Sequence, residues 1–475
     1  MPIVLLCAVL AATLAHAAPV IVPPEARSAL GLTVYSGENL ALVRDTRRAT
    51  LSSGEQELRF VGVPAQLEPR TVMLRSPAGA PLVVREQQWR WDLASTPALL
   101  ERWIGREVEL VETDERLRTR VTPATLLRVR DGLVVRIGDQ LVPDPPGRVR
   151  LPAATHDLVL EPAVIWRLAD APAGTLELEA TYVTGGLGWS ADYVAVLHPD
   201  ESAIDLSAWV TLTNQSGSRF DDATLALVAG EVHRVSAPER RFRAAPMAMA
   251  EAAMAPAELA EGPSESGFTE HHRYAYEGRV TLPDQATTQL PLLAATDVPI
   301  ERRYQVRGTS PWLRAAGATG DLGTRLPVRV VFLLRNTTAH RLGRPLPAGT
   351  MRLWARDGAG TLALVGEDRL AHLPRDETAE LTVANASEIV AYWQQTDFRK
   401  LEVEPYQVET AVRVTLRNRK TVPVTVVVHE PVDGQWRVLE SSVPARKHDA
   451  RTLAFDVAVP AGGETVLTWR LQVGR

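Results

Sequence analysis

Apolar and polar residues alternate with a period of two along most of the chain. Clear runs of this alternation cover residues 175–183, 204–212 and 412–416. Successive side chains of a β-strand point to opposite faces, so the pattern predicts strands with one buried face. We therefore expect an all-β protein.

Turn signals divide these runs. Asp-Gly pairs lie between two alternating runs at Asp131-Gly132, Asp357-Gly358 and Asp433-Gly434. Both residues tolerate the positive φ of tight primed turns, so each pair predicts a hairpin. The segment Pro-Ala-Gly recurs at Pro172, Pro347 and Pro460, each time before a new alternating run. We interpret it as a turn that leads into a strand.

A short helix is predicted directly after Thr96. Thr96 can cap it, Pro97 suits the first helical position, and an apolar stripe follows at Leu99, Leu100, Trp103 and Ile104. Short alternating runs follow on both sides of Asp131-Gly132. They are enough for a small, five-stranded, barrel-like module.

The 475 residues allow about three domains at roughly 150 residues each. We expect several β-sandwich-like domains, a small β-barrel-like module and one short helix. Residues 236–270 are rich in Ala, Pro and Met, including Met247, Met249 and Met254, and predict a flexible linker. The expected division is a signal peptide (1–17), an N-terminal β-domain (18–95), the helix with the small module (96–150), a β-sandwich (151–235), the linker (236–270), a second β-sandwich (271–400) and a C-terminal β-sandwich (401–475).

The first 17 residues have the pattern of a secretory signal peptide. Residues 2–14 carry no charge, and Ala15-His16-Ala17 has the small-x-small form of a cleavage site. Cys7, the single cysteine, lies in this segment, so the mature chain would hold no disulfide and no thiolate ligand. No later stretch predicts a transmembrane segment in the mature chain. We expect export to the periplasm or cell surface of a bacterium.

Composition excludes several classes of function. The net charge of −5 argues against a nucleic-acid binder, which would present a basic field. Only Lys400, Lys420 and Lys447 are lysines, so the first 399 residues hold no Walker-type phosphate loop and no Schiff-base lysine.

Several motifs resemble those of a bacterial family of exported proteins of unknown function, some of whose members are labelled mucoidy inhibitor A. They are Tyr-Val-Thr-Gly-Gly-Leu-Gly-Trp-Ser-Ala-Asp-Tyr at 182–193, and the motifs at 346–349, 366–368, 395–398 and 414–418. The resemblance runs from about residue 30 to the C-terminus. It implies an all-β architecture and an envelope location, and no activity. Members labelled mucoidy inhibitor A carry a coiled-coil insert, whereas this chain shows no sustained heptad.

The glycine-rich part of the first motif is a candidate recognition turn. Three glycines suggest positive φ angles or a close backbone approach, and they would fix two aromatic residues and an acid beside a rigid turn. The candidate residues are Gly185, Gly186, Gly188, Trp189, Asp192 and Tyr193. The alternative is a structural corner, with Trp189 in the core and Asp192 capping backbone amides. The motif also matches a dinucleotide fingerprint formally, but a strand is predicted where a helix is required, so no cofactor is expected.

Other polar and aromatic residues give weaker signals. Trp89 and Trp91 would share one face of a strand, as core or as a platform for a sugar ring. His271 and His272 would point to opposite faces, so the sequence predicts no metal site there. His372 and the His448-Asp449 pair lack the nucleophile motif of a catalytic triad.

We therefore expect an exported, non-catalytic β-rich protein that binds or scaffolds an envelope protein or glycan. No catalytic, cofactor or metal residues are predicted. The alternative is an envelope hydrolase or carbohydrate-active protein with Asp192 or Asp397 among its acids.

Overall fold

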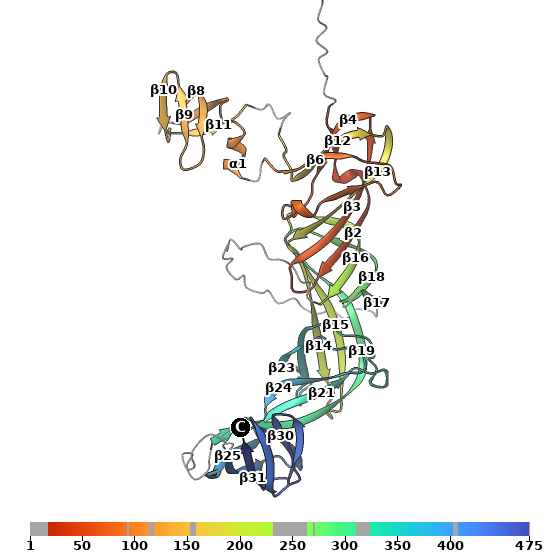
Figure 1. The fold of residues 1–475 in the computed structure, drawn as a ribbon, viewed down its shortest axis with the longest axis vertical. Helices are drawn as coiled ribbons and strands as arrows, with labels where there is room; N and C mark the ends of the chain where they lie inside the picture. Colours follow the sequence, from red (N-terminus) through yellow and green to blue (C-terminus); the bar gives the residue numbers. More distant parts are fainter. Residues whose placement is uncertain are drawn as a thin grey trace, which may run out of the picture. The chain divides into compact units, whose positions relative to one another are not determined.

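The computed structural model describes residues 18–92, 95–113, 118–152, 158–230, 264–268, 271–309, 324–401 and 407–474. They divide into two compact units. The first contains the chain up to Trp189 with segments around β16 (Phe220–Ala229) and β18 (His271–Leu282). The second contains Ser190–Thr211 and Gln289–Arg475. Figure 1 labels strands along the whole described chain and a single α-helix, which confirms the all-β fold class with several sheets.

Some sequence predictions concern residues outside this description. They are the signal peptide (1–17) and nearly all of the linker (236–270), including Met247, Met249 and Met254. The finer division into seven segments stays a prediction. Within the described residues, no helix combines the length and the apolar character needed to cross a bilayer.

Two sheets form the core of the first unit. The larger follows the order β17-β18-β16-β2-β3-β13-β5, and the smaller the order β1-β4-β12-β6. Their apolar residues are buried at alternate positions, as Leu30, Leu32 and Val34 illustrate. The ring of Phe60 meets the edge of Trp166 at 5.8 Å. The remaining elements are β1 (Val20–Val22), η1 (Pro24–Ala26), β2 (Arg27–Tyr35), β3 (Leu40–Leu51), β4 (Gly54–Val61), η2 (Pro69–Thr71), β5 (Met73–Arg75), β6 (Val84–Arg90), β12 (Ala163–Ala171), β13 (Gly174–Gly185) and β17 (Ser264–Phe268).

The small module has the expected helix and five strands, but its sheet is open. The order β10-β9-β8-β7-β11 leaves β10 and β11 as edges, so no barrel closes. The helix is capped by Ser95, whose Oγ accepts from Ala98 N at 3.2 Å, and not by the predicted Thr96, which is already helical. Trp103, Leu110 and Leu126 form the core. The elements are α1 (Thr96–Glu101), β7 (Glu107–Thr113), β8 (Thr119–Arg128), β9 (Val134–Ile137), β10 (Gln140–Pro143) and β11 (Arg148–Arg150).

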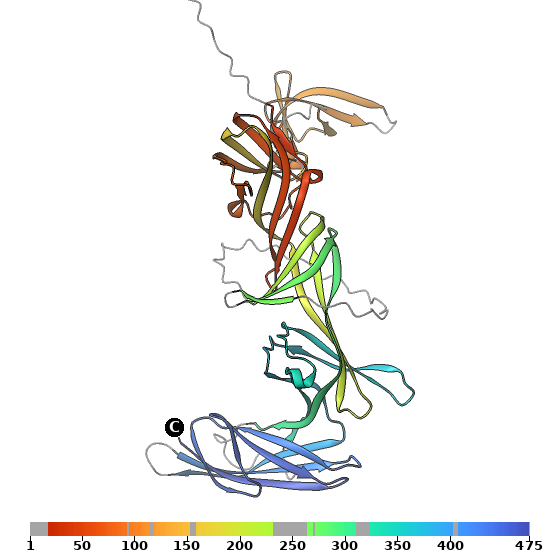
Figure 2. The ribbon, with the colours of Figure 1, turned by 90° about the vertical axis from the view of Figure 1, so that its right-hand side faces the viewer.

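Two further sheets build the second unit. One follows β23-β22-β14-β15-β19-β27-β30-β29, with β21 paired to β19 and β24 paired to β21, and the other follows β20-β25-β26-β31-β28. Figure 2 shows the strands of the C-terminal segment (blue) side by side. Phe455 and Trp469 meet at 4.9 Å in the core. The elements are β14 (Leu187–Leu197), β15 (Ala203–Asn214), β19 (Ala286–Arg307), β20 (Thr324–Leu326), β21 (Arg329–Arg335), η3 (Thr338–His340), β22 (Gly349–Arg356), β23 (Leu362–Leu370), β24 (Thr378–Asn385), β25 (Ile389–Leu401), β26 (Gln407–Asn418), β27 (Val424–Pro431), β28 (Gln435–Ser441), β29 (Arg446–Asp449), β30 (Thr452–Val459) and β31 (Glu464–Gly474).

Two of the three Asp-Gly hairpins are confirmed, between β8 and β9 and between β22 and β23. The third prediction is wrong. The strands that flank Asp433-Gly434 pair with different partners, β27 with β30 and β28 with β31, so this turn carries the chain from one sheet to the other. Gly434 has a φ of 94°, and a Cβ there would lie 2.4 Å from the carbonyl oxygen of Gly474. Glycine is therefore required by the close approach and not by a hairpin. The three Pro-Ala-Gly segments do lead into strands, namely β13, β22 and β31.

Three buried asparagines anchor strand ends in the same way. Asn214 ends β15, Asn336 follows β21 and Asn418 ends β26, and each is at most 2 % exposed. The Nδ2 group of each donates to three backbone carbonyls at 2.8–3.4 Å. The acceptors are Ser218, Leu282 and Pro283 for Asn214; Arg344, Leu373 and Pro374 for Asn336; Val422, Val459 and Pro460 for Asn418.

The local sequences explain why the contact recurs. Each asparagine stands two residues after a leucine. Two of the three carbonyls to which it donates belong to a Leu-Pro or Val-Pro pair. Proline has no N–H, so the regular ladder of strand hydrogen bonds ends at these segments. The asparagine amide donates to their carbonyls inside the core, and the carbonyls of Leu373 and Pro460 also accept from the backbone N–H groups of Leu346 and Gly463. The sequence analysis did not recognise this repeat.

Replacing Asn418 with Asp should lower the free energy of unfolding of the second unit by about 3 kcal/mol or more. The carboxylate keeps the shape but loses the donor to the carbonyls of Val422, Val459 and Pro460, of which Pro460 also accepts from Gly463 N. Each carbonyl left unsatisfied costs about 1–3 kcal/mol. Denaturant unfolding measures the change. The control Asn385→Asp alters an exposed asparagine and should shift stability by less than about 0.5 kcal/mol. Equal effects of the two substitutions would contradict the anchoring role.

A buried ion network joins the two sheets of the first unit. The side chains of Asp45 and Arg47 are fully buried and 2.7 Å apart, and Arg27 adds two hydrogen bonds of 2.9 Å to the same carboxylate. Arg47 also donates to the carbonyls of Val22 in β1 and Val61 in β4, at 3.0 and 2.6 Å. Burial alone would raise the pKa of Asp45, but the hydrogen bond from Arg27 and the charge of Arg47 outweigh it and hold that pKa below its usual range.

The first unit should therefore lose stability in acid through Asp45. A carboxyl with a lowered pKa stabilises the folded state above its ordinary value of 3.8, and this contribution disappears as the pH falls below it. Asp45→Asn should cost about 3–5 kcal/mol at pH 7, because two buried guanidinium groups lose their counter-charge. Measured by denaturant unfolding, the difference in the free energy of unfolding between Asp45→Asn and the wild type should become smaller below about pH 4.

The control for this experiment is Glu177→Gln, which removes a surface ion pair with Arg48 at 3.5 Å. It should change stability by about 1 kcal/mol or less. The expected ionisation of Asp45 would be contradicted if the free energies of unfolding of Asp45→Asn and the wild type differed by the same amount from pH 7 to pH 2.

Candidate functional site

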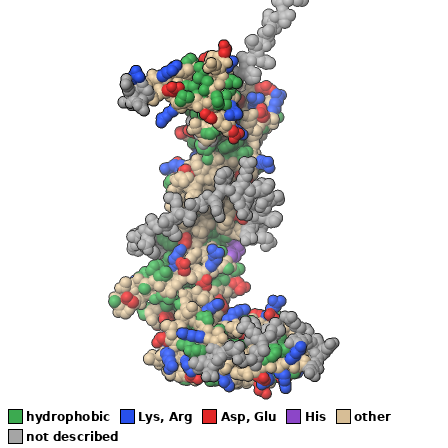
Figure 3. All heavy atoms as spheres, turned by 90° about the vertical axis from the view of Figure 1, so that its left-hand side faces the viewer, with side chains coloured by type: hydrophobic (Ala, Val, Ile, Leu, Met, Phe, Trp, Pro, Cys, Tyr) green, Lys and Arg blue, Asp and Glu red, His purple; other side chains and the backbone are tan. Residues whose placement is uncertain are grey.

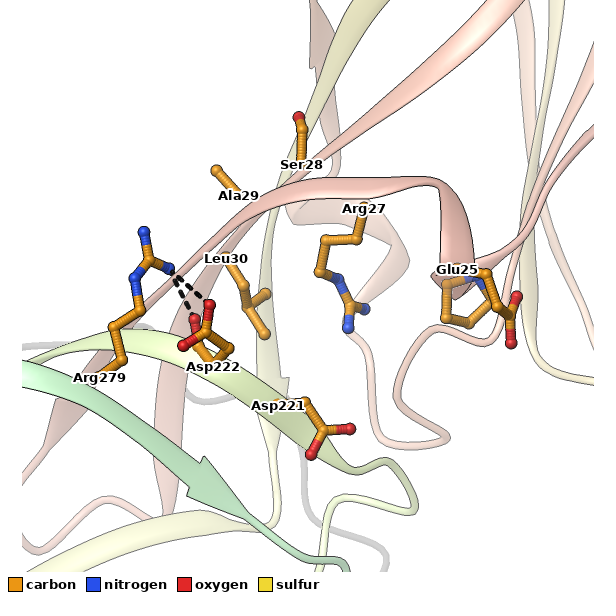
Figure 4. Close-up of a pocket in the computed structure, with 9 residues that line it drawn as sticks. Glu25, Arg27, Ser28, Ala29, Leu30, Asp221, Asp222 and Arg279 are labelled. Atoms are coloured by element: carbon orange, nitrogen blue, oxygen red, sulfur yellow. Dashed lines mark hydrogen bonds and ion pairs between the residues drawn. The ribbon is translucent and has the colours of Figure 1, made fainter.

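The seven-stranded sheet of the first unit opens between β2 and β16. Parallel pairing of the two strands starts at Gly31 and Thr224, and the earlier residues of β2 pair only with β3 within the described chain. β16 has a bulge at the same level, where Asp222 has a φ of 51°. The resulting cavity of about 320 Å³ is lined by Pro24, Glu25, Arg27, Ser28, Ala29, Leu30, Asp221, Asp222 and Arg279 (Figure 4).

The two arginines of this cavity are held by carboxylates. Figure 4 shows Arg279 reaching Asp222: its Nη1 donates to the backbone carbonyl at 2.7 Å and lies 3.4 Å from Oδ2. Arg27 is bound to Asp45 of the buried network. Neither guanidinium is therefore available as an isolated positive charge.

The carboxylates are the more accessible groups. The side chains of Asp221 and Asp222 expose 53 % and 76 % of their surface. Asp221 accepts from Arg219 Nε at 2.6 Å, and Glu25 forms no ion pair with another described residue. The opening thus combines backbone without a strand partner and a slight excess of negative charge. On the face drawn in Figure 3, charges of both signs are scattered and no basic patch appears.

The predicted recognition turn lies between β13 and β14, and Gly186 is its key residue. Gly186 has a φ of 78°, and a Cβ there would lie 2.7 Å from the backbone of Ser216. Its carbonyl accepts from Gln215 N at 2.6 Å. Gly185 and Gly188 do not have left-handed φ values, so the expectation of positive φ holds at one glycine of three.

The other residues of the predicted turn are divided between the two units. Trp189 belongs to the first, where it is 5 % exposed and donates to Val228 O at 3.3 Å. Tyr193 belongs to the second, fully buried, and donates to Pro347 O at 2.7 Å. Both rings are core groups and do not form a recognition surface.

Asp192 does not cap backbone amides. Its carboxylate accepts from Thr211 Oγ1 at 2.7 Å and from Arg352 at 3.1 Å. The second acid of the hydrolase alternative, Asp397, accepts from Arg470 at 2.6 Å, and this hydrogen bond lowers its pKa. A carboxyl whose pKa is lowered, as that of Asp397 is, is poorly suited to donate a proton in catalysis.

One histidine and two acids from distant segments come together in the second unit. His198, Asp205 and Asp297 place possible ligand atoms within 4.8 Å of one another. His198 Nε2 is 3.1 Å from Asp205 Oδ1, and Arg341 lies 2.9 Å from Asp297 Oδ2. The backbone N–H of Asp297 lowers the pKa of Asp205. Arg341 thus neutralises Asp297, and the carboxylate of Asp205 is hydrogen-bonded to His198 and to the Asp297 N–H.

The remaining sequence candidates lie apart from these groups. Trp89 is half-buried on β6, and Trp91 is half-buried just beyond the end of that strand. His271 and His272 begin β18, and the side chain of His271 is outside the description. His448 stacks on His429 at 4.8 Å, and burial lowers the pKa of His429.

The sequence analysis missed the opening between β2 and β16. Its walls come from residues 24–30, 221–222 and 279, which no local pattern connects. The adjacent acids Asp221 and Asp222 interrupt the alternation at the start of β16, and this was the one local signal of a bulge. Comparison of the chain with family models and with curated proteins finds no match.

Gly186→Ala should destabilise the protein much more than Gly188→Ala. The first places a methyl group 2.7 Å from backbone at a positive φ and should cost about 2 kcal/mol or more. The second meets Asn39 at 3.4 Å with ordinary φ and should cost less than about 1 kcal/mol. Thermal unfolding of both variants measures the difference, and a larger loss for Gly188→Ala would contradict the assignment.

Proposed function

We propose that this chain is an exported, non-catalytic protein of the bacterial cell envelope that binds an extended segment of a partner protein at the opening between β2 and β16. The observation that carries this proposal is the interrupted pairing of β2 before Gly31, next to accessible carboxylates. An extended peptide adds to such a strand through main-chain hydrogen bonds, and side chains supply the specificity.

The charges of the opening favour a partner segment with a basic side chain. Arg27 and Arg279 are already paired with carboxylates. Glu25 forms no ion pair with another described residue, and the one ion pair of Asp221, with Arg219, is exposed and therefore weak, so both acids can accept from a lysine or arginine. The opening lies on strands fixed by the buried network below it, so a partner would meet a preformed site. Preformed sites cost less ordering entropy on binding.

Export, the periplasm or cell surface as location, and kinship with the mucoidy inhibitor A family are parts of the same proposal. Their support is the pattern of residues 1–17 and the motifs around residues 182–193 and 414–418. The arginine pairs of Asp192 and Asp397 support the non-catalytic part.

A site-specific photo-crosslink tests the opening. A photoreactive amino acid replaces the exposed Ala29 in one variant and the exposed Glu177 of β13, away from the opening, in the control. In the native envelope fraction, position 29 should capture one protein near one-to-one, and position 177 should not. Asp221→Arg should reduce the yield at position 29 at least tenfold at an unchanged melting temperature.

Two outcomes would overturn the proposal. One is the absence of a protein adduct at position 29. The other is equal labelling from position 177, which would mean that the capture is nonspecific.

A further inference from the structure

Two histidines of one sheet stack on each other in the second unit. His429 belongs to β27 and His448 to β29, and their ring centres lie 4.8 Å apart with an angle of 23° between the planes. His429 is half-buried, and its strand lies inside the sheet between β19 and β30. His448 is exposed on β29, the last strand in the order of that sheet. The stack therefore joins the interior of the sheet to its edge.

The edge strand β29 is held by few contacts. It has four residues, all of them exposed, and within the described chain it pairs only with β30. The register shifts between Lys447 and Asp449, so the ladder is irregular at His448. By contrast, β30 pairs with β27 along all eight of its residues. Short exposed segments with few contacts open most easily, so β29 can separate while the rest of the sheet stays paired.

The surroundings of His429 favour its neutral form. Burial has the largest effect on its pKa and lowers it below the ordinary value of 6.5, and the charges of His448 and Arg446 on β29 and of Arg307 on β19 act in the same direction. Glu380 of β24 acts in the opposite direction but does not reverse the shift. Protonation of His429 is therefore costly as long as β29 is in place.

The other contacts of β29 involve side-chain types that keep their charge in mild acid. Arg446 Nη2 lies 3.4 Å from Asp456 Oδ1, and the Nζ of Lys447 lies 5.9 Å from the centre of the Trp436 ring. The carboxylate of Asp449 accepts from a backbone N–H at 2.6 Å, which lowers its pKa. Histidine is the side chain whose ordinary pKa lies between pH 5 and 8. Among the described residues, the histidine stack is thus the contact of β29 that responds to mild acid.

We propose that β29 is a pH-sensitive strap, which is released from β30 when both stacked histidines become protonated. Two positive rings 4.8 Å apart repel each other, and release returns both to water. Because the pKa of His429 is lowered with β29 in place, the docked form loses stability as the pH falls below 6.5. Release leaves the N–H and C=O groups on the outer edge of β30 without a strand partner.

Hydrogen exchange of the full chain at pH 7.5 and pH 5.0 tests the proposal, with rates corrected for the intrinsic effect of pH. In the wild type, the protection of amides in β29 and on the outer edge of β30 should fall at least fivefold at pH 5.0. The protection of β26 and β31, which belong to the other sheet of this unit, should stay within twofold.

Two variants of the stack and one control assign the effect. His429→Phe keeps an aromatic ring against His448 and removes the half-buried charge, so the protection of β29 should differ less than twofold between the two pH values. His448→Glu replaces repulsion by attraction to protonated His429, so protection should not fall at pH 5.0. His340→Phe is the control: His340 is also half-buried but lies in η3, outside the stack, and this variant should keep the full response.

The proposal is overturned if His429→Phe keeps the response of the wild type, or if His448→Glu loses protection in acid as the wild type does. It is also overturned if the protection of β26 and β31 falls as much as that of β29, which would indicate general unfolding in acid. Loss of the response in His340→Phe would show that the stack is not its source.

Discussion

The buried asparagine amide is the contact on which the strand ends of this protein depend. At each of three places, one side chain donates to the carbonyls of a chain segment that reads Leu-Pro or Val-Pro. Buried peptide groups must find partners, and water does not reach these positions. A single amide thus lets a strand end inside the core and lets the chain turn toward another sheet. The same contact recurs in both units, so both units end strands by the same local arrangement of asparagine and proline.

The polar core of the first unit contributes both to stability and to the proposed binding site. Arg27 belongs to the ion network of Asp45 and Arg47, and it also lines the opening between β2 and β16. A ligand at the opening would therefore contact a side chain whose position is set by two sheets. The second unit separates these tasks. Its anchors, Asn336 and Asn418, are not among the residues that line the cavity of about 230 Å³ in this unit.

The sequence predicted those features that depend on neighbouring residues. Alternation located the strands, so β13, β15 and β26 appear where the pattern placed them. The turn at Asp433-Gly434 could not be predicted in full. The residue types indicate the backbone conformation of the turn, but they do not indicate which sheet the next strand joins. The turn at Gly186 was found for the same local reason. The sequence left Trp189 open between a recognition surface and the core, because burial depends on strands far away in the chain, and the structure places it in the core.

The sites were harder to predict than the strands. The opening joins residues 24–30 to Arg279, and the cluster of the second unit joins His198 to Asp297. Such pairs become neighbours only through sheet order, which the hydrophobic pattern does not encode. The anchors were the exception that the sequence did contain: Leu-x-Asn followed later by Leu-Pro or Val-Pro recurs three times. Two of the motifs that carry the family resemblance include Gly186 and Asn418, so part of that resemblance reflects packing.

The anchors bear on how this protein can be produced. Asn214-Gln-Ser216 and Asn336-Thr-Thr338 have the form of acceptor sites for N-linked glycans. Their amides are buried in the folded chain, so a transferase could reach them only before folding. A glycan added then would occupy the nitrogen that must bind three carbonyls, and the strand ends could not close. Secretion from a eukaryotic host would thus trap the chain in an unfolded form, whereas a bacterial host without that transferase would not.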